Sequence, residues 1–266
     1  MKIETAKLVY FSPTGTTRTV LENIARGIHP VKTDSIDITT PDARSDPLVT
    51  SEHDLLIIGV PVYMGRIPAL LTGWLNEMKA YRTPAVCVVV YGNRVYDDAL
   101  LELRNSVMKS GCIPIAGAAF IGEHSFSSPD VPTAHGRPDA EDISQAVLFG
   151  QKVREKLYAI ADITQVPEVQ VPGVYPYRGD TTLWTVDFIN VSDNCSQCGL
   201  CANHCPVGAI DPHNSHLIQV ERCITCCACI KNCPEHARTM KPGLVRDAQM
   251  RLHTLYHERK EPELFL

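Results

Sequence analysis

A repeated cysteine pattern constrains this chain more than any other feature, because it uses eight of the eleven cysteines. Each copy has the form Cys-x2-Cys-x2-Cys-x3-Cys-Pro, and its cysteines are Cys195, Cys198, Cys201 and Cys205 in the first copy and Cys223, Cys226, Cys229 and Cys233 in the second. Three thiolates on such a tight loop can each reach one iron of a cubane cluster, and the cysteine before proline can ligate a second cluster. The repeat therefore predicts two [4Fe–4S] clusters and a redox protein.

Structural zinc and disulfide bonds are the alternatives to clusters. Zinc usually takes two cysteine pairs separated by a dozen or more residues, rather than a triplet with a fourth cysteine before proline. Disulfides need an oxidising compartment, and the N-terminal segment Met1–Lys7 shows no signal-peptide core. The longest apolar run, Ala85–Tyr91, has seven residues, which is far too short to cross a bilayer. We therefore expect a cytoplasmic protein, and since oxygen attacks exposed cubanes, an anaerobic or microaerobic host.

The composition is that of an ordinary globular protein. The chain has 266 residues, of which 44% are hydrophobic and 21% charged, and this length suits one full domain with a smaller one. Its net charge of −5 gives no basic surface of the kind that binds nucleic acid.

The N-terminal region begins with a strand, a hydroxyl-rich loop and a helix. The strand pattern Ala6–Phe11 leads into the loop Ser12–Thr17, and apolar residues then recur at helical spacing up to Ile28. Backbone N–H groups at a helix N-terminus bind anions, and the hydroxyls complete the cradle. The loop lacks the Gly-Lys-Ser/Thr ending of a Walker loop and the Gly-x-Gly-x-x-Gly dinucleotide fingerprint. A monophosphate ester therefore fits best, and a simple Ser/Thr helix cap is the alternative.

Strand and helix patterns then alternate along the first 165 residues. Further strands are expected at Thr33–Ile38, Asp54–Val60, Ala85–Tyr91 and Ile113–Ile121, and helices at Ile67–Lys79, Tyr96–Lys109 and from Asp139 to about Ile160. Continuous apolar strands separated by helices predict a parallel sheet covered on both faces. Five strands in this sequence fit the doubly wound arrangement 2-1-3-4-5, in which ligands bind at the carboxyl ends of the strands.

The cysteine repeat resembles the bacterial two-cluster ferredoxins, and the Ser12–Thr17 loop resembles the phosphate loop of flavodoxins. With the segments Phe120–Ser125 and Gly136–Asp139, the chain as a whole resembles the flavodoxin–ferredoxin fusion proteins of anaerobic bacteria. The resemblance implies a flavodoxin-like α/β domain followed by a small α+β 2[4Fe–4S] ferredoxin domain. The expected boundaries are 1–165 for the flavin domain, 166–190 for a linker, 191–243 for the ferredoxin domain and 244–266 for a C-terminal helix.

The ferredoxin resemblance implies that the fourth cysteine of each motif ligates the cluster of the other motif. One cluster then takes Cys195, Cys198, Cys201 and Cys233, and the other takes Cys223, Cys226, Cys229 and Cys205. Among the remaining cysteines, Cys87 and Cys112 are expected in the core. Cys227 stands where the first motif has Gly199, and we expect a free thiol there.

The flavodoxin resemblance implies FMN, with its ring beside the loops Gly59–Pro68 and Tyr91–Asp98. The predicted FMN contacts are Ser12, Thr14, Gly15, Thr16, Thr17, Pro61, Val62, Tyr63, Met64, Gly65, Arg66, Tyr91, Gly92, Asn93, Arg94, Tyr96 and Asp97. Flavodoxins typically carry acidic residues in the loop after the fourth strand, whereas this chain has Arg94 there and Arg66 on the other loop. A cation near the ring would stabilise the reduced flavin anion. The alternative is that both arginines point to solvent or pair with neighbouring aspartates.

Two functions follow from these cofactors. The first is an electron carrier that passes electrons between FMN, the two clusters and redox partner proteins, one a donor and one an acceptor. The second is a flavin-dependent oxidoreductase that reduces a small molecule with electrons supplied through the clusters. No acid–base constellation adjoins the loops, and His124 is the best single candidate for such chemistry. We therefore expect the carrier and assign no catalytic residue.

Overall fold

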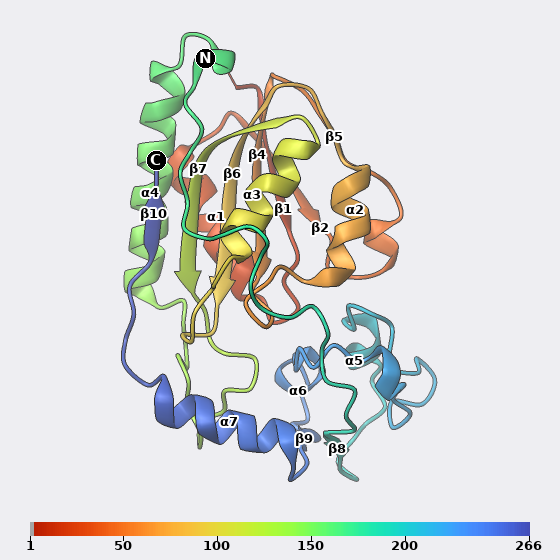
Figure 1. Cartoon of the computed structure of the whole chain (residues 1–266). Helices are drawn as coiled ribbons and strands as arrows, with labels where there is room; N and C mark the ends of the chain where they lie inside the picture. Colours follow the sequence, from red (N-terminus) through yellow and green to blue (C-terminus); the bar gives the residue numbers. More distant parts are fainter. Residues whose placement is uncertain (1–2) are drawn as a thin grey trace.

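A twisted parallel sheet forms the centre of the N-terminal domain in the computed structural model, which describes residues 3–266 (Figure 1). Its five parallel strands lie in the order β2 (Lys32–Asp37), β1 (Thr5–Tyr10), β4 (Asp54–Pro61), β6 (Thr83–Tyr91) and β7 (Cys112–Ile121). All nine residues of β6 are buried, as expected of a central parallel strand covered on both faces. This strand order is the flavodoxin-like 2-1-3-4-5 arrangement, so the predicted fold class is confirmed.

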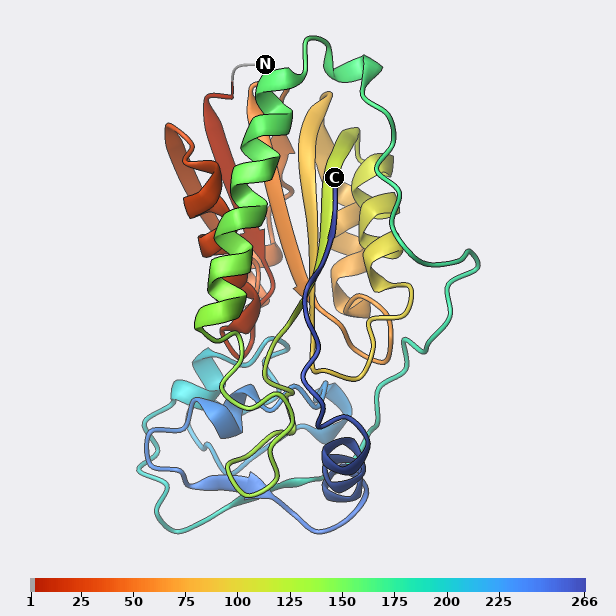
Figure 2. The ribbon, with the colours of Figure 1, turned by 90° about the vertical axis from the view of Figure 1, so that its left-hand side faces the viewer.

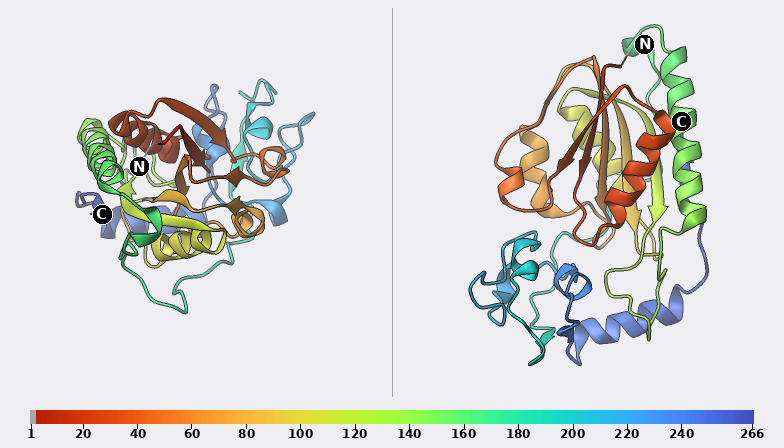
Figure 3. Two further views of the ribbon diagram at one scale, coloured as in Figure 1. Left: turned by 90° about the horizontal axis from the view of Figure 1, so that it is seen from above. Right: turned by 180° about the vertical axis from the view of Figure 1, so that it is seen from behind.

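Helices cover the two faces of this sheet (Figure 2). One face carries α1 (Thr16–Ile28) and α4 (Ala140–Ala159), and the other carries α2 (Thr72–Glu77) and α3 (Ala99–Lys109). Viewed from above in Figure 3, the sheet lies between these pairs. No helix within residues 3–266 has the length and apolar character that a membrane span requires.

Helices α1 and α4 approach closely because each has a glycine at the contact. A Cβ added at Gly27 would lie 2.0 Å from the Val147 carbonyl oxygen, and one added at Gly150 would lie 2.1 Å from the Ile24 carbonyl oxygen. Any larger residue at Gly27 or Gly150 would push the two helices apart. Helix α4 begins at Asp139, whose carboxylate accepts hydrogen bonds from the Glu141 and Asp142 backbone N–H groups.

A sixth strand corrects the predicted five-stranded sheet. β10 (Glu263–Phe265) comes from the end of the chain and pairs antiparallel with the edge strand β7. The predicted C-terminal helix over 244–266 is therefore shorter, because α7 (Leu244–Leu255) ends well before β10. The predicted helix over Ile67–Lys79 is also shorter. It divides into η2 (Ala69–Leu71), α2 and the short strand β5 (Lys79–Ala80), which pairs with β3 (Val49–Thr50). Two further 3-10 turns are η1 (Asp42–Arg44) and η3 (Ile163–Gln165).

The cysteine-rich domain lies below the carboxyl ends of the parallel strands (Figures 1 and 2). Its antiparallel pair is β8 (Ile189–Val191) with β9 (Arg238–Met240), and its helical turns are α5 (Leu200–Asn203), η4 (Val220–Arg222) and α6 (Ala228–Lys231). The two motifs fold alike. Gly199 and Cys227 occupy matching positions before α5 and α6, and both have a left-handed backbone, with φ of 75° and 57°.

The linker packs against the flavodoxin-like domain, and Asp98 anchors it. The buried Asp98 carboxylate accepts hydrogen bonds from the backbone N–H groups of Val174 and Arg178, and it also pairs with the Arg178 guanidinium. This Arg178 pairing lowers the pKa of Asp98 to about 2. Further along, the ring of Trp184 stacks on Phe126 with centroids 6.4 Å apart. The cysteine-rich domain is therefore held against the sheet rather than on a free tether.

The segment between α7 and β10, residues 256–262, runs back up the edge of the flavodoxin-like domain (Figure 2). The Asn93 side chain donates to the carbonyl oxygens of Tyr256 and Glu258 at 2.7 and 2.8 Å. The Tyr96 hydroxyl donates to the Glu263 carboxylate at 2.7 Å. The C-terminal segment is thus a second connection, besides the linker, between the cysteine-rich domain and the sheet.

Candidate functional site

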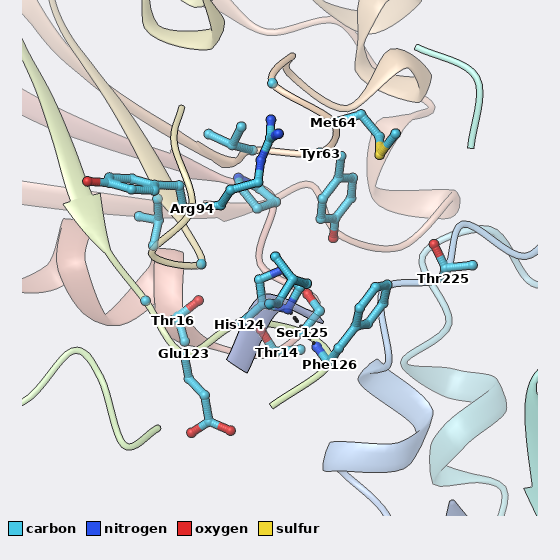
Figure 4. Close-up of a pocket in the computed structure, with 18 of the residues that line it drawn as sticks. Thr14, Thr16, Tyr63, Met64, Arg94, Glu123, His124, Ser125, Phe126 and Thr225 are labelled. Carbon is cyan, nitrogen blue, oxygen red and sulfur yellow. Dashed lines mark hydrogen bonds between the residues drawn. The ribbon is translucent and has the colours of Figure 1, made fainter. Parts of the chain in front are cut away.

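A cavity of about 520 Å³ opens at the carboxyl ends of the parallel strands, where the two domains meet (Figure 4). This volume lies in the usual range for a small-molecule site. Its walls come from the loops after β1, β4, β6 and β7, from the linker, from one turn of the cysteine-rich domain and from α7. The cavity therefore forms only when all parts of the chain come together.

The loop after β1 forms an anion cradle at one end of the cavity. Gly15 has a left-handed φ of 86°, which lets the chain turn directly into α1. The Thr17 hydroxyl is buried, and within residues 3–266 it has no hydrogen-bond partner. A buried hydroxyl normally has a partner, so this orphaned group fits a bound oxyanion. Thr14 and Thr16 line the cavity beside it (Figure 4).

Aromatic side chains form the part of the cavity nearest the cysteine-rich domain. In Figure 4 the ring of Tyr63 points towards His124 and Phe126, with Thr225 on the facing turn. His124 and Phe126 make an edge-to-face contact with ring centroids 5.0 Å apart. Gly92 makes room for this histidine, because a Cβ there would lie 2.3 Å from the His124 Cδ2 atom. Flat rings at these positions suit a flat aromatic ligand.

His124 is neutral at pH 7 in this setting. Burial, with smaller contributions from Lys231 and Arg94, lowers the pKa of His124 to about 4. Its Nδ1 atom accepts a hydrogen bond from the Phe126 backbone N–H at 3.0 Å. The proton of the neutral ring therefore resides on Nε2, which can donate to a ligand.

The structure brings twelve of the seventeen predicted FMN contacts to this cavity. They are Ser12, Thr14, Thr16, Thr17, Pro61, Val62, Tyr63, Met64, Gly65, Tyr91, Gly92 and Arg94. The Arg94 guanidinium also pairs with Asp97 at 2.8 Å, as the alternative reading expected.

The other five predicted residues lie outside the cavity lining: Gly15, Arg66, Asn93, Tyr96 and Asp97. Gly15 acts through its backbone turn, and Asp97 pairs with Arg94. Asn93 and Tyr96 are buried, and their side chains hold the C-terminal segment instead of lining the cavity.

Arg66 also departs from the prediction. Its guanidinium makes two hydrogen bonds to the Glu102 carboxylate, at 2.8 and 2.7 Å, and lies 5.0 Å from the Tyr177 ring centroid. It therefore joins a loop, a helix and the linker instead of facing the cavity.

Several cavity residues were missing from the predicted contacts. His124 and Phe126 follow β7, and the rule that ligands bind at strand ends would have found this loop. Trp184, Thr225 and Arg251 come from the linker, the second cysteine motif and α7. No local signal marks these three residues, since only the packing of the domains brings them to the cavity.

The eight motif cysteines separate into two sets, each around a small cavity of its own. One cavity is lined by Cys195, Cys198, Cys201 and Cys233, and the other by Cys205, Cys223, Cys226 and Cys229. The fourth cysteine of each motif thus lies with the first three of the other. All eleven cysteines are free of disulfides. Within residues 3–266, no three His, Cys, Asp or Glu side chains converge closely enough to hold a single metal ion.

Polar contacts fix the cysteine-rich domain against the loops that line the large cavity. Lys231 in α6 pairs with the Glu123 carboxylate and donates to the Ser127 carbonyl oxygen at 3.1 Å. Asn232 donates to the Pro13 carbonyl oxygen at 3.2 Å, in the loop that carries the anion cradle.

Residues 188–234 match the family model of the 4Fe-4S dicluster domain. A stretch of 88 residues is 34% identical to the thiosulfate reductase electron transfer subunit PhsB of Salmonella typhi, and it covers 30% of this chain and 45% of that relative. The chain thus spans less than half the length of the curated relative that it matches.

The N-terminal domain is similar in structure to an archaeal flavodoxin, with a TM-score of 0.42, 14% sequence identity, and coverage of 58% of this chain and 99% of the other. A second similar structure is a flavodoxin of Fusobacterium nucleatum bound to flavin mononucleotide. Its TM-score is 0.36 and its sequence identity 13%, with coverage of 58% of this chain and 99% of the other. At these scores the fold assignment rests on the strand order itself. The chain thus joins a domain that has the flavodoxin-like strand order to a region that matches the 4Fe-4S dicluster domain.

Proposed function

We propose that this protein is an electron carrier that holds FMN in the large cavity and one [4Fe–4S] cluster in each cysteine set. The observation that carries the proposal is the arrangement of the doubled motif around two small cavities, one of which adjoins the large cavity. Redox partner proteins, a donor and an acceptor, exchange electrons with it. The similarity to an electron transfer subunit supports such partners.

The residues of the large cavity fit FMN at both of its ends. The Ser12–Thr17 loop would hold the phosphate, with the orphaned Thr17 hydroxyl as one donor. Tyr63 and Phe126 would flank the ring, and neutral His124 would donate its Nε2 proton to a ring acceptor. When bound, FMN supplies exchange of one or two electrons, and each cluster supplies exchange of one.

The cysteine sets fit cubane clusters better than single ions. A zinc site needs four ligands around one atom, whereas each set here surrounds a cavity. Cys195, Cys198, Cys201 and Cys233 would hold one cluster, and Cys205, Cys223, Cys226 and Cys229 the other. Cys227 is buried in the second cavity wall as a fifth cysteine and would remain a free thiol.

A flavin-dependent oxidoreductase is the second candidate. The observation in its favour is the cationic side chain of Arg251, which lines the cavity from the exposed surface of α7. Turnover of NAD(P)H, quinones or nitro compounds by the cofactor-loaded protein would favour this activity, and electron exchange with proteins alone would favour the carrier.

The cofactor content tests the proposal directly. Anaerobically purified protein is expected to contain about eight iron and eight sulfide per chain, as two [4Fe–4S] clusters require, together with one releasable FMN. Metal and sulfide analysis, and chromatography of the heat-released flavin, give these counts. Stoichiometric zinc with little iron, or FAD in place of FMN, would contradict the proposal.

The two arginines on the cavity loops are expected to behave differently. Arg94 lines the cavity, so Arg94→Gln should lower the flavin midpoint potential by on the order of 20 mV, which corresponds to about 1 kcal/mol for a two-electron couple. Arg66 is paired with Glu102 away from the cavity, so Arg66→Gln should leave the midpoint unchanged. It should instead lower the free energy of unfolding by about 2 kcal/mol, because the buried Glu102 carboxylate loses its charged partner. Anaerobic redox titration and denaturation of both variants measure these effects. Equal midpoint shifts in the two variants would contradict this assignment.

A further inference from the structure

Only the second cysteine motif reaches the flavin cavity. Ile224 and Thr225, which lie between Cys223 and Cys226, line its wall, whereas no residue of the segment 191–218 does so among those described. Ile224 also lines the small cavity of the cysteine set that contains Cys223. One side chain therefore borders both cavities.

The cysteine set beside the large cavity is also the more buried of the two. Cys226 and Cys229 are each 8% exposed, and Cys205 and Cys223 are half-buried. In the other set Cys198 is exposed to solvent. One set thus lies between the domains, and the other reaches the outer surface.

Hydrogen bonds between the two domains also lie next to ligands of the buried set. Arg44 donates to the Pro206 carbonyl oxygen at 2.8 Å, directly after Cys205. Lys231 and Asn232, which lie between Cys229 of this set and Cys233 of the other, bind the loops that carry Glu123 and Pro13. The Arg44 contact therefore adjoins the buried set alone, and the contacts of Lys231 and Asn232 adjoin one ligand of each set.

We infer that the Ile224–Thr225 turn is the junction through which electrons pass between the flavin cavity and the clusters. The set of Cys205, Cys223, Cys226 and Cys229 then holds an inner cluster, and the set that contains Cys198 holds an outer cluster that meets the redox partner. This inference rests on the proposed function, because it assigns the order of the cofactors that the function requires.

Each passage moves one electron from one centre to the next and by itself makes and breaks no covalent bond. The reductant is a reduced one-electron redox protein at the outer end. Full reduction of a flavin takes two such passages, and the protons that then bind to its ring nitrogens come from solvent.

The pseudo-symmetry of the two motifs provides a matched pair of variants. Thr225 and Gln197 hold equivalent places in their motifs, with φ of 53° and 56°. A carboxylate at position 225 would lie between the flavin cavity and the inner cluster, and it should lower both midpoint potentials because it disfavours added negative charge. Gln197→Glu keeps the acceptor oxygen that binds the Ser215 N–H, and it should lower the midpoint of the outer cluster alone.

Anaerobic redox titration of Thr225→Asp and Gln197→Glu, with visible spectra for the flavin and EPR for the clusters, reads out these shifts. We expect the flavin midpoint to fall in Thr225→Asp and to keep its wild-type value in Gln197→Glu. A flavin midpoint that responds to Gln197→Glu, or to neither substitution, would overturn the inference.

A second pair of variants keeps the test decisive if a carboxylate at the buried Thr225 prevents folding. Cys198→Ala should remove the outer cluster, and electrons placed on the flavin by flash photoreduction should still reach the remaining cluster. In Cys226→Ala this transfer should be lost, because the remaining cluster lies beyond the junction. Retained transfer in Cys226→Ala with loss in Cys198→Ala would reverse the order. Failure of the proposed function would look different, since the wild-type protein would then lack FMN or iron.

Discussion

Replacing Cys205 by alanine is expected to remove the cluster of the other motif, the one built on Cys223, Cys226 and Cys229. The Cys205 side chain lies in the cavity of that set, and its Sγ accepts a hydrogen bond from the Ala209 N–H at 3.2 Å. A cubane needs its fourth ligand, so the iron content should fall from about eight to about four per chain. Iron analysis and EPR of the reduced protein measure the loss.

Double variants show which cluster has been lost. Adding Cys226→Ala to Cys205→Ala should remove no further iron, because both residues belong to one set. Adding Cys198→Ala should remove the rest, because Cys198 belongs to the other set. Cys227→Ala is the matched control, and it should keep all the iron although Cys227 is adjacent to a ligand and 2% exposed. Additive loss in Cys205→Ala/Cys226→Ala would refute the crossed arrangement.

Thr17→Val should weaken FMN binding by roughly 10- to 100-fold. Within residues 3–266 the buried Thr17 hydroxyl has no hydrogen-bond partner, and a hydrogen bond to a charged phosphate contributes about 1.5–3 kcal/mol. Valine keeps the shape of the side chain and removes only the hydroxyl. Flavin titration of the apoprotein, followed by fluorescence quenching, measures the affinity.

The same substitution should leave the free energy of unfolding of the flavin-free protein unchanged or raise it. An unpaired buried hydroxyl costs free energy, and valine removes that cost. Thr19→Val is the control, because the Thr19 hydroxyl already donates to the Gly15 carbonyl oxygen at 3.1 Å and does not line the cavity. If Thr19→Val weakened FMN binding as much as Thr17→Val, the role given to the Thr17 hydroxyl would be wrong.

The main features of the fold follow from local sequence patterns. The five parallel strands and the helices α1, α3 and α4 lie within a few residues of their predicted positions, because buried parallel strands and amphipathic helices leave strong periodic signals. Strand β10 leaves no such signal. Three residues at the end of a chain, Glu263–Phe265, become a strand only because β7 offers an unpaired edge.

In the candidate flavin site, too, some features could be predicted from the sequence and others could not. The Ser12–Thr17 loop and Tyr63 could be predicted from the sequence, since a residue directly after a parallel strand must lie at the ligand-binding edge of the sheet. Side chains further along the same loops can turn away from the cavity when another part of the protein offers them a hydrogen-bond partner. Arg66 has Glu102 within reach, and Asn93 has the carbonyl oxygens of the returning C-terminal segment.

The sequence alone determined the chemistry, because cluster ligands are specified by residue type and spacing along a short loop. Only the tertiary structure decided how the parts are joined. Which cysteine set lies against the large cavity, and which reaches solvent at Cys198, depends on how the two domains dock. The two motifs have the same spacing, so nothing in the spacing distinguishes them. The difference arises from contacts between residues far apart in the chain, such as Lys231 with Glu123 and Asn232 with Pro13, which no local pattern encodes.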